Sequence, residues 1–129
     1  MKHPQPTKAE SSILAALWKM GAGTVRDVLN SIREEAPDTG YTTILKLMQI
    51  MTEKGLLVRD TSRRTHVYKP AQPESKMKRQ LVRELADRVF DGAAGTLILQ
   101  ALPLVKAKPE ELAEIRKLID SMSEEENNS

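Results

Sequence analysis

The order of apolar patterns across residues 7–70 constrains the fold of this chain more than any other feature. Three successive segments carry apolar residues three and four positions apart, the spacing that buries one face of an α-helix. These residues are Ile13, Leu14, Leu17 and Trp18, then Val25, Val28, Leu29 and Ile32, then Ile44, Leu47, Met48 and Met51. Two β-prone runs follow at 56–60 and 65–69, on either side of a short polar tip. We therefore expect three helices followed by a β-hairpin.

Caps and breakers separate these elements. The pattern TKAE at 7–10 predicts a capping box, in which Thr7 accepts from a backbone N–H and Glu10 reaches back to the cap. Thr24 can cap the second helix, and the breaker-rich segment 35–40 predicts a turn before the third. Gly55 suits the left-handed position after a helix end. Helix, helix, helix, hairpin is the element order of a winged helix-turn-helix.

A second periodic block follows from residue 73. Apolar residues recur at helical spacing in three groups, which are Met77, Leu81, Leu85 and Val89, then Leu97, Ile98, Ala101 and Leu102, then Leu112, Ile115, Leu118, Ile119 and Met122. Pro109 suits the first turn of the last helix. We expect a mainly α protein with a winged helix-turn-helix domain at 1–72, a three-helix domain at 73–123 and a disordered acidic tail at 124–129.

A three-helix unit of this size buries little apolar surface by itself. We expect two copies to pack together through these helices and form a homodimer. The interface is assigned to Leu81, Leu85, Val89, Leu97, Ile98, Ile115, Leu118 and Ile119. The alternative is that the same helices fold back on the first domain of their own chain.

Composition argues against several classes of function. The chain has no cysteine and two histidines, His3 and His66, which are far apart in sequence. A metal site, a bound cofactor and a catalytic centre are therefore not expected, and no phosphate loop or nucleophile motif is visible. No apolar run approaches the length of a membrane span, so we expect a cytoplasmic protein without membrane insertion.

The third predicted helix carries polar side chains opposite its apolar face. Thr42, Lys46 and Gln49 lie there, with Thr43 beside them. Lys46 can donate to guanine or to a phosphate, Gln49 can make a two-point contact with adenine, and threonines can contact phosphate or a thymine methyl. Basic residues are in excess in the same half of the chain: residues 1–73 hold 11 Lys and Arg against 7 Asp and Glu, whereas residues 74–129 hold 9 against 11.

The predicted hairpin tip carries Arg63 and Arg64, which suit contact with phosphate or with a minor groove. Tyr41 either packs under the start of the third helix or places its hydroxyl on a phosphate. His66 is expected to be a cross-strand surface residue, because it has no partner histidine or cysteine. These residues and the polar helix face together predict an interface for double-stranded DNA.

Several segments resemble the BlaI/MecI-type penicillinase repressor family. The resemblance lies in LAALWKMGAGTVRDVLNSI (14–32), YTTILKLMQIMTEKGLLVRD (41–60) and RRTHVYKP (63–70), and also in VFDGAAGTLILQAL (89–102) and PEELAEIRKLID (109–120). It implies a winged-helix dimer that represses transcription, with Thr42, Thr43 and Lys46 at the reading positions. It also implies a membrane sensor metalloprotease of the BlaR/MecR type as a partner that cleaves the dimerisation region, and a link to antibiotic resistance.

This chain departs from that family's pattern at identifiable positions. Ile50 stands where many members have arginine, so one expected basic contact is missing. The cleaved Asn-Phe pair of the penicillinase repressors falls on Gln100 and Ala101. The cysteines of the related copper-responsive repressors are absent.

The sequence thus predicts a dimeric transcriptional repressor that binds palindromic operator DNA in promoter regions and is released by sensor-triggered proteolysis. The alternative is a winged-helix protein–protein interaction module without sequence-specific DNA binding. Lys46, Arg63 and Arg64 discriminate between the two, because a helix that binds only protein would not need cations on that face and on the wing.

Overall fold

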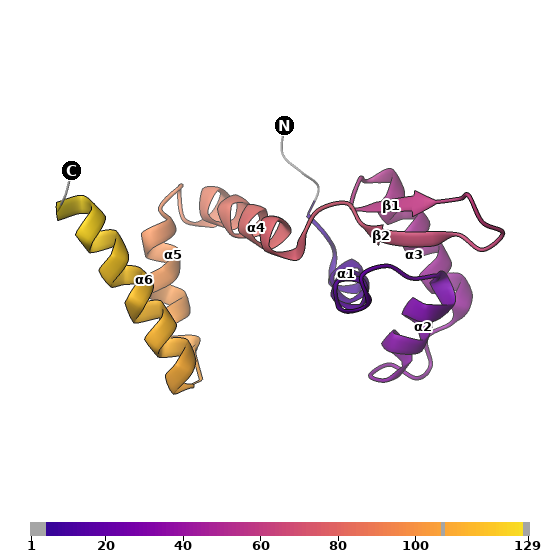
Figure 1. Cartoon of the computed structure of the whole chain (residues 1–129), viewed down its shortest axis with the longest axis horizontal. Coiled ribbons are helices and arrows are strands. Elements are labelled where there is room, and N and C mark those ends of the chain that lie inside the picture. The colour runs from indigo at the N-terminus through magenta and orange to yellow at the C-terminus, as the bar shows by residue number, and fades with distance from the viewer. Residues whose placement is uncertain (1–4, 107, 128–129) are drawn as a thin grey trace. The chain divides into compact units, whose positions relative to one another are not determined.

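The computed structural model describes residues 5–106 and 108–127. The chain divides into two compact units, residues 1–84 (unit 1) and residues 85–129 (unit 2). Its elements follow one another as labelled in Figure 1. They are α1 Lys8–Met20, α2 Val25–Arg33, α3 Tyr41–Glu53, β1 Leu57–Asp60, β2 Val67–Pro70, α4 Glu74–Val89, α5 Ala94–Ala101, the 3₁₀ turn η1 Leu102–Leu104, and α6 Pro109–Asn127. The expected mainly α, winged helix-turn-helix architecture is confirmed.

Unit 1 has one continuous apolar core. It is built from the inward faces of α1, α2 and α3, with β1 against α3 and β2 against α1. Its buried members are Ile13, Leu14, Leu17, Val25, Val28, Leu29, Ile44, Met48, Met51, Leu56, Leu57, Tyr68 and Met77. Only one of these is aromatic, so interdigitating aliphatic and methionine side chains fill the space between the helices.

Both predicted caps form. The Thr7 hydroxyl accepts from the Glu10 N–H at 3.2 Å, and the Glu10 carboxylate accepts from the Thr7 N–H at 2.8 Å. Thr24 and Asp27 make the same reciprocal pair at the start of α2. Each box satisfies two backbone donors that the helix itself leaves unpaired, and this defines where α1 and α2 begin.

The hairpin is antiparallel, with Leu57 opposite Pro70 and Asp60 opposite Val67. The first strand ends at Asp60 as expected, but the second begins at Val67 and not at residue 65, so the wing tip comprises residues 61–66. Gly23 extends this sheet, because its N–H and carbonyl both pair with the backbone of Tyr68. A Cβ at Gly23 would meet the sulfur of the exposed Met20 side chain, which would have to move to make room for it.

The division between the units differs from the expected boundary at 72/73. Met77, on the first turn of α4, is 4% exposed and belongs to the core of unit 1. Leu81 packs partly against the same core. The four-residue repeat along α4 shows which side chains are apolar, but it does not show which core they join.

Unit 2 comprises the end of α4 together with α5, η1 and α6. Within residues 85–129, Ala86 is the one described residue that is buried. The helix α6 continues to Asn127, which corrects the expected disordered tail over 124–127; residues 128 and 129 lie outside the described residues. Glutamate is a good helix former, and residues 124–126 contain no breaker that would end the helix.

Candidate nucleic-acid interface

The helix α3 has two distinct faces, as the apolar pattern predicts. Ile44, Met48 and Met51 are at most 3% exposed, and Leu47 is half-buried against the core. The opposite side carries Thr42, Thr43, Lys46 and Gln49, and all four are exposed. We name these four residues the reading face. Ile50 lies between the two sides and is half-buried.

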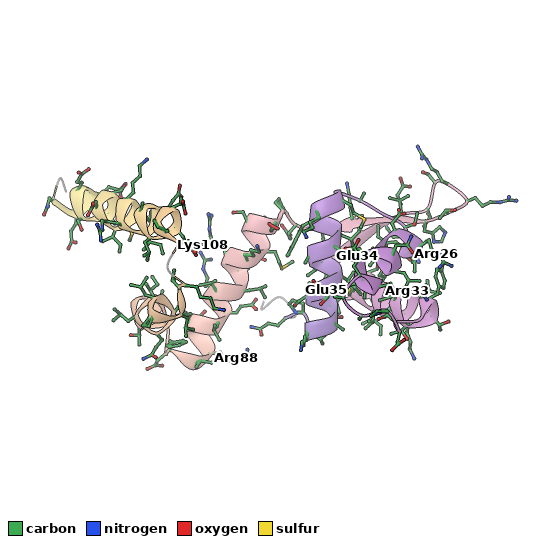
Figure 2. All side chains as sticks on the ribbon, turned by 90° about the horizontal axis from the view of Figure 1, so that it is seen from below. Arg26, Arg33, Glu34, Glu35, Arg88 and Lys108 are labelled. Atoms are coloured by element: carbon green, nitrogen blue, oxygen red, sulfur yellow. The ribbon has the colours of Figure 1, made fainter. Side chains whose placement is uncertain are left out.

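The turn between α2 and α3 is held by side-chain hydrogen bonds. Arg33 Nε donates to the Thr39 carbonyl at 2.9 Å, and the Thr39 hydroxyl donates to the Ala36 carbonyl at 2.8 Å. Arg33 and Arg26 stand at opposite ends of α2 (Figure 2). Arg33 thus connects the last turn of α2 to the residues just before α3. This contact helps to fix the orientation of α3 and of its reading face.

The wing tip is shaped by Asp60. Its Oδ1 accepts from the Ser62 N–H at 2.9 Å, which closes a tight local turn. That hydrogen bond, together with the charges of Arg63 and Lys69, lowers the pKa of the Asp60 carboxyl below its ordinary value. Arg63 and Arg64 are both exposed, as expected. Arg63 therefore has an acidic neighbour, whereas the structure assigns no such neighbour to Arg64.

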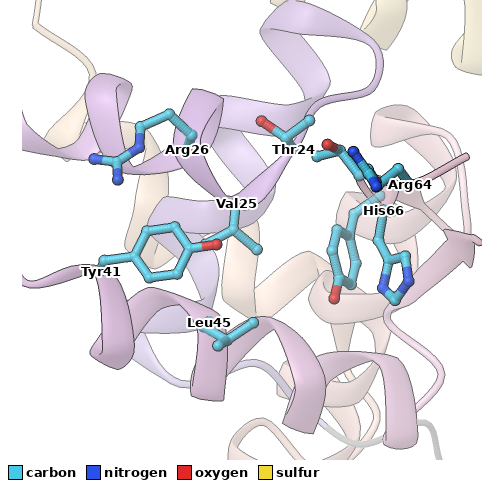
Figure 3. Close-up of a pocket in the computed structure, with 9 residues that line it drawn as sticks. Thr24, Val25, Arg26, Tyr41, Leu45, Arg64 and His66 are labelled. Carbon is cyan, nitrogen blue, oxygen red and sulfur yellow. The ribbon is translucent and has the colours of Figure 1, made fainter.

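A hollow opens between the start of α2, the start of α3 and the wing. Figure 3 shows the Arg26 guanidinium over the Tyr41 ring, with Arg64 and His66 entering from the wing. The Arg26 carbon Cζ lies 5.0 Å from the centre of the Tyr41 ring, a cation–π distance. The nine lining residues are Thr24, Val25, Arg26, Tyr41, Leu45, Arg64, Thr65, His66 and Tyr68. None of these nine is acidic.

A family profile described as penicillinase repressor matches residues 6–121 of this chain. The chain belongs to the penicillinase repressor family. One curated relative, the penicillinase repressor of Bacillus licheniformis, is 24% identical over 122 residues, and the match covers 92% of each chain. The expected resemblance is confirmed, and with it the expectation of a transcriptional repressor at the level of the family.

In this repressor an ion pair joins the far end of α3 to the start of α1. Lys54 Nζ lies 2.9 Å and 3.0 Å from the two carboxylate oxygens of Glu10, whose side chain is 2% exposed. Burial alone would raise the pKa of Glu10. The hydrogen bonds from Thr7 and Lys54 and the charge of Lys54 outweigh burial, and the pKa is lowered from its ordinary 4.5. Lys54 is therefore a structural cation rather than part of the reading face.

The expected dimerisation residues fall into two groups. Leu85, Val89, Ile98, Leu118 and Ile119 are between 39% and 63% exposed in the single chain. Leu81, Leu97 and Ile115 are half-buried, and Leu81 packs against unit 1. The apolar surface available to a second copy therefore lies mainly on unit 2.

Sequence reasoning did not single out Arg26 and expected only a surface role for His66. A signal for Arg26 was present, because a cation in the first turn of a helix opposes the helix dipole and implies another purpose. In the described part of the chain no three acidic or histidine side chains gather as metal ligands would, and no helix there is both long and apolar enough to span a bilayer. His3 lies outside the described residues.

Proposed function

We propose that this repressor acts as a homodimer on palindromic operator DNA, with α3 of each copy in a major groove and the wing on the adjacent backbone. The observation that carries the proposal is the reading face. Four exposed polar side chains stand on one side of a helix whose other side packs against the core, and a cationic wing belongs to the same compact unit. A major groove admits one such helix.

The reading face has the chemistry to distinguish base pairs. Gln49 can donate to and accept from an adenine edge, and Lys46 can donate to guanine O6 and N7 or to a phosphate. Thr42 and Thr43 stand in the first turn, where recognition helices approach bases and backbone most closely. Tyr41 is 41% exposed, and the Arg26 guanidinium lies over its ring, so its hydroxyl is accessible to a phosphate as well.

The surface of unit 2 supports the proposed dimer. Large apolar side chains on the end of α4, on α5 and on α6 are exposed in the single chain, and burying them against a second copy would recover the hydrophobic free energy that unit 2 lacks alone. Twofold symmetry of the dimer matches twofold symmetry of an operator.

Release of the operator is proposed to follow proteolysis in unit 2 by a membrane sensor metalloprotease. Gln100 and Ala101, which stand where the family resemblance places the cleaved pair, are exposed at the end of α5. Cutting there would separate α6 from the rest of unit 2 and remove part of the dimer surface. Co-expression of this chain with a membrane sensor metalloprotease of the BlaR/MecR type, followed by mass spectrometry of the fragments, tests this step.

Footprinting of the purified protein on DNA upstream of its own gene tests the main proposal. We expect a protected palindrome whose half-sites are about one helical turn, ~10 base pairs, apart. Absence of protection on that DNA, and on a genomic fragment library, would favour the alternative of a protein–protein interaction module.

A further inference from the structure

We propose that the hollow beside α3 seats one backbone phosphate of the bound DNA, with Arg26 as its main cationic ligand and Tyr41 as the residue that positions Arg26. This inference rests on the proposed function and adds a specific contact to it. We call Arg26, Tyr41, Arg64 and His66 the phosphate seat.

Arg26 has no local structural purpose that accounts for its charge. It is the second residue of α2, close to the positive end of the helix dipole, where a cation is unfavourable. Within the described part of the chain it makes neither an ion pair nor a hydrogen bond, and its contact is with the ring of Tyr41. Stacking on a ring leaves the guanidinium N–H groups free to donate in their plane, which is the geometry that phosphate oxygens accept.

The other side of the hollow supplies one further positive charge, that of Arg64. His66 and Thr65 line the same side from the wing and offer an imidazole and a hydroxyl. The nearest carboxylate in sequence, that of Asp27, does not line the hollow, and its Oδ2 is occupied by the Thr24 N–H at 3.0 Å. Cations and hydroxyls without a carboxylate favour an anion as occupant.

The position of the hollow favours a backbone phosphate over a base edge. The hollow lies between the first turn of α3 and the wing, beside the reading face rather than on it. By helix geometry the N–H groups of Val25 and Arg26, at the start of α2, have no partner within their helix and are suitable donors to an anion. A helix in the major groove has a phosphate strand along each flank, so one phosphate comes to this position.

Arg26→Gln tests the seat, because it removes the charge and keeps a polar side chain of helical propensity. We expect about tenfold weaker binding, equal on operator and on unrelated DNA, and a salt dependence of affinity shallower by about one unit for each DNA-binding unit engaged. Lys19→Gln is the matched control, since it removes one charge from an exposed position on α1 that does not line the hollow. The control should change affinity by less than about twofold.

Ethylation interference locates the phosphate. For the unchanged protein, ethylating one phosphate in each half-site should block binding; for Arg26→Gln the same ethylation should have little further effect. Arg26→Lys should not restore the interference, because an ammonium lacks the planar fork that stacks on Tyr41. Tyr41→Leu, which leaves the charge in place but removes its support, should weaken the same interference signal in part.

The wing provides an internal comparison. Arg64→Ala should weaken binding more than Arg63→Ala, because Arg64 lines the hollow and Arg63 is next to Asp60. Equal losses would contradict the participation of Arg64 in the seat.

The outcomes separate the seat from the proposed function. If the unchanged protein binds no DNA, the proposed function fails. If it binds, and Arg26→Gln melts at the same temperature yet keeps both affinity and interference pattern, the seat is wrong and the function stands. A loss confined to one operator base pair would overturn the seat as well, because it would make Arg26 a reader of bases.

Discussion

Both units of this chain carry apolar residues at helical spacing, but the units differ in how far these residues are buried. In unit 1 the periodic residues of α1, α2 and α3 are buried in one core. In unit 2 the periodic residues of α5 and α6 remain largely exposed, Leu118 and Met122 by 63% and 62%. The comparison shows that an apolar stripe specifies burial, but not whether the burying surface comes from the same chain or from another.

The two units should also differ in how their stability depends on protein concentration. Unit 1 has capped helices, a closed core and a sheet bridge at Gly23, so its stability should not depend on protein concentration. Unit 2 has Ala86 as its one described buried residue, so its stability should rise with concentration as copies associate. Trp18 is the only tryptophan in the chain and packs against the core of unit 1, so its fluorescence reports on that unit alone.

The largest expected effect is that of Met48→Ala compared with Met122→Ala. Met48 is fully buried, and its truncation should lower the free energy of unfolding of unit 1 by about 2–5 kcal/mol through lost burial and the cavity left behind. Met122→Ala should leave the Trp18 transition in urea unchanged and should act only on dimer association. Equal shifts of the Trp18 transition in the two variants would contradict the expected difference between the two units.

Leu118→Asp should weaken dimerisation at least about a hundredfold, because it places a charge in apolar surface that the second copy must cover. Analytical ultracentrifugation should show monomers at micromolar concentration, while the Trp18 melting curve stays in place. Ser123→Asp is the control. It adds the same charge five residues further along α6, on the other side of the helix by its periodicity. An intact Leu118→Asp dimer would show that the interface lies elsewhere.

Lys46→Ala should act on DNA and leave both units folded and paired. We expect specific binding to weaken by about 1–3 kcal/mol if Lys46 reads a base, with relaxed discrimination at one base pair of each half-site. If Lys46 contacts phosphate instead, the loss should be the same on all sequences and the salt dependence shallower. Titrations of operator and mutated operator at two salt concentrations distinguish these results, and no change in either would remove Lys46 from the reading face.

The smallest expected effect concerns the ion pair within unit 1. Because the pKa of Glu10 is lowered in the fold, the ionised carboxylate contributes stability above its ordinary 4.5 and loses it as pH falls through the lower folded value. Lys54→Gln should remove about 1–2 kcal/mol at pH 7, where the ammonium would otherwise pair with the buried carboxylate. The same substitution should reduce the loss of stability as the pH falls below 4.5. Thermal melts followed by Trp18 fluorescence at pH 7 and across the acid range below pH 4.5 measure both effects, with the exposed Lys8→Gln as control.

Local patterns in the sequence predict much of unit 1. The capping pairs at Thr7 and Thr24 join residues three positions apart, and the two faces of α3 follow from periodicity alone. The reading face is exposed where the pattern places it, so the residues proposed to contact bases needed no structure to be identified.

Contacts between distant residues could not be predicted in the same way. Glu10 and Lys54 are 44 positions apart, and nothing local marks them as a pair. The proposed role of Arg26 depends on Tyr41 and the wing, which lie close to it only in the folded chain. The boundary expected at 72/73 differs from the division at 84/85, because Met77 and Leu81 share their spacing with the exposed Leu85 and Val89 but pack against the core of unit 1.

The burial of Met77 has a consequence for synthesis of the protein on the ribosome. Domains fold as units while the chain emerges, N-terminal part first. A nascent chain that has released only residues 1–72 lacks the side chain that completes its core, and its apolar interior is open where Met77 will sit. The shortest fragment that can fold with the complete core of unit 1 therefore includes the first two turns of α4, through Leu81.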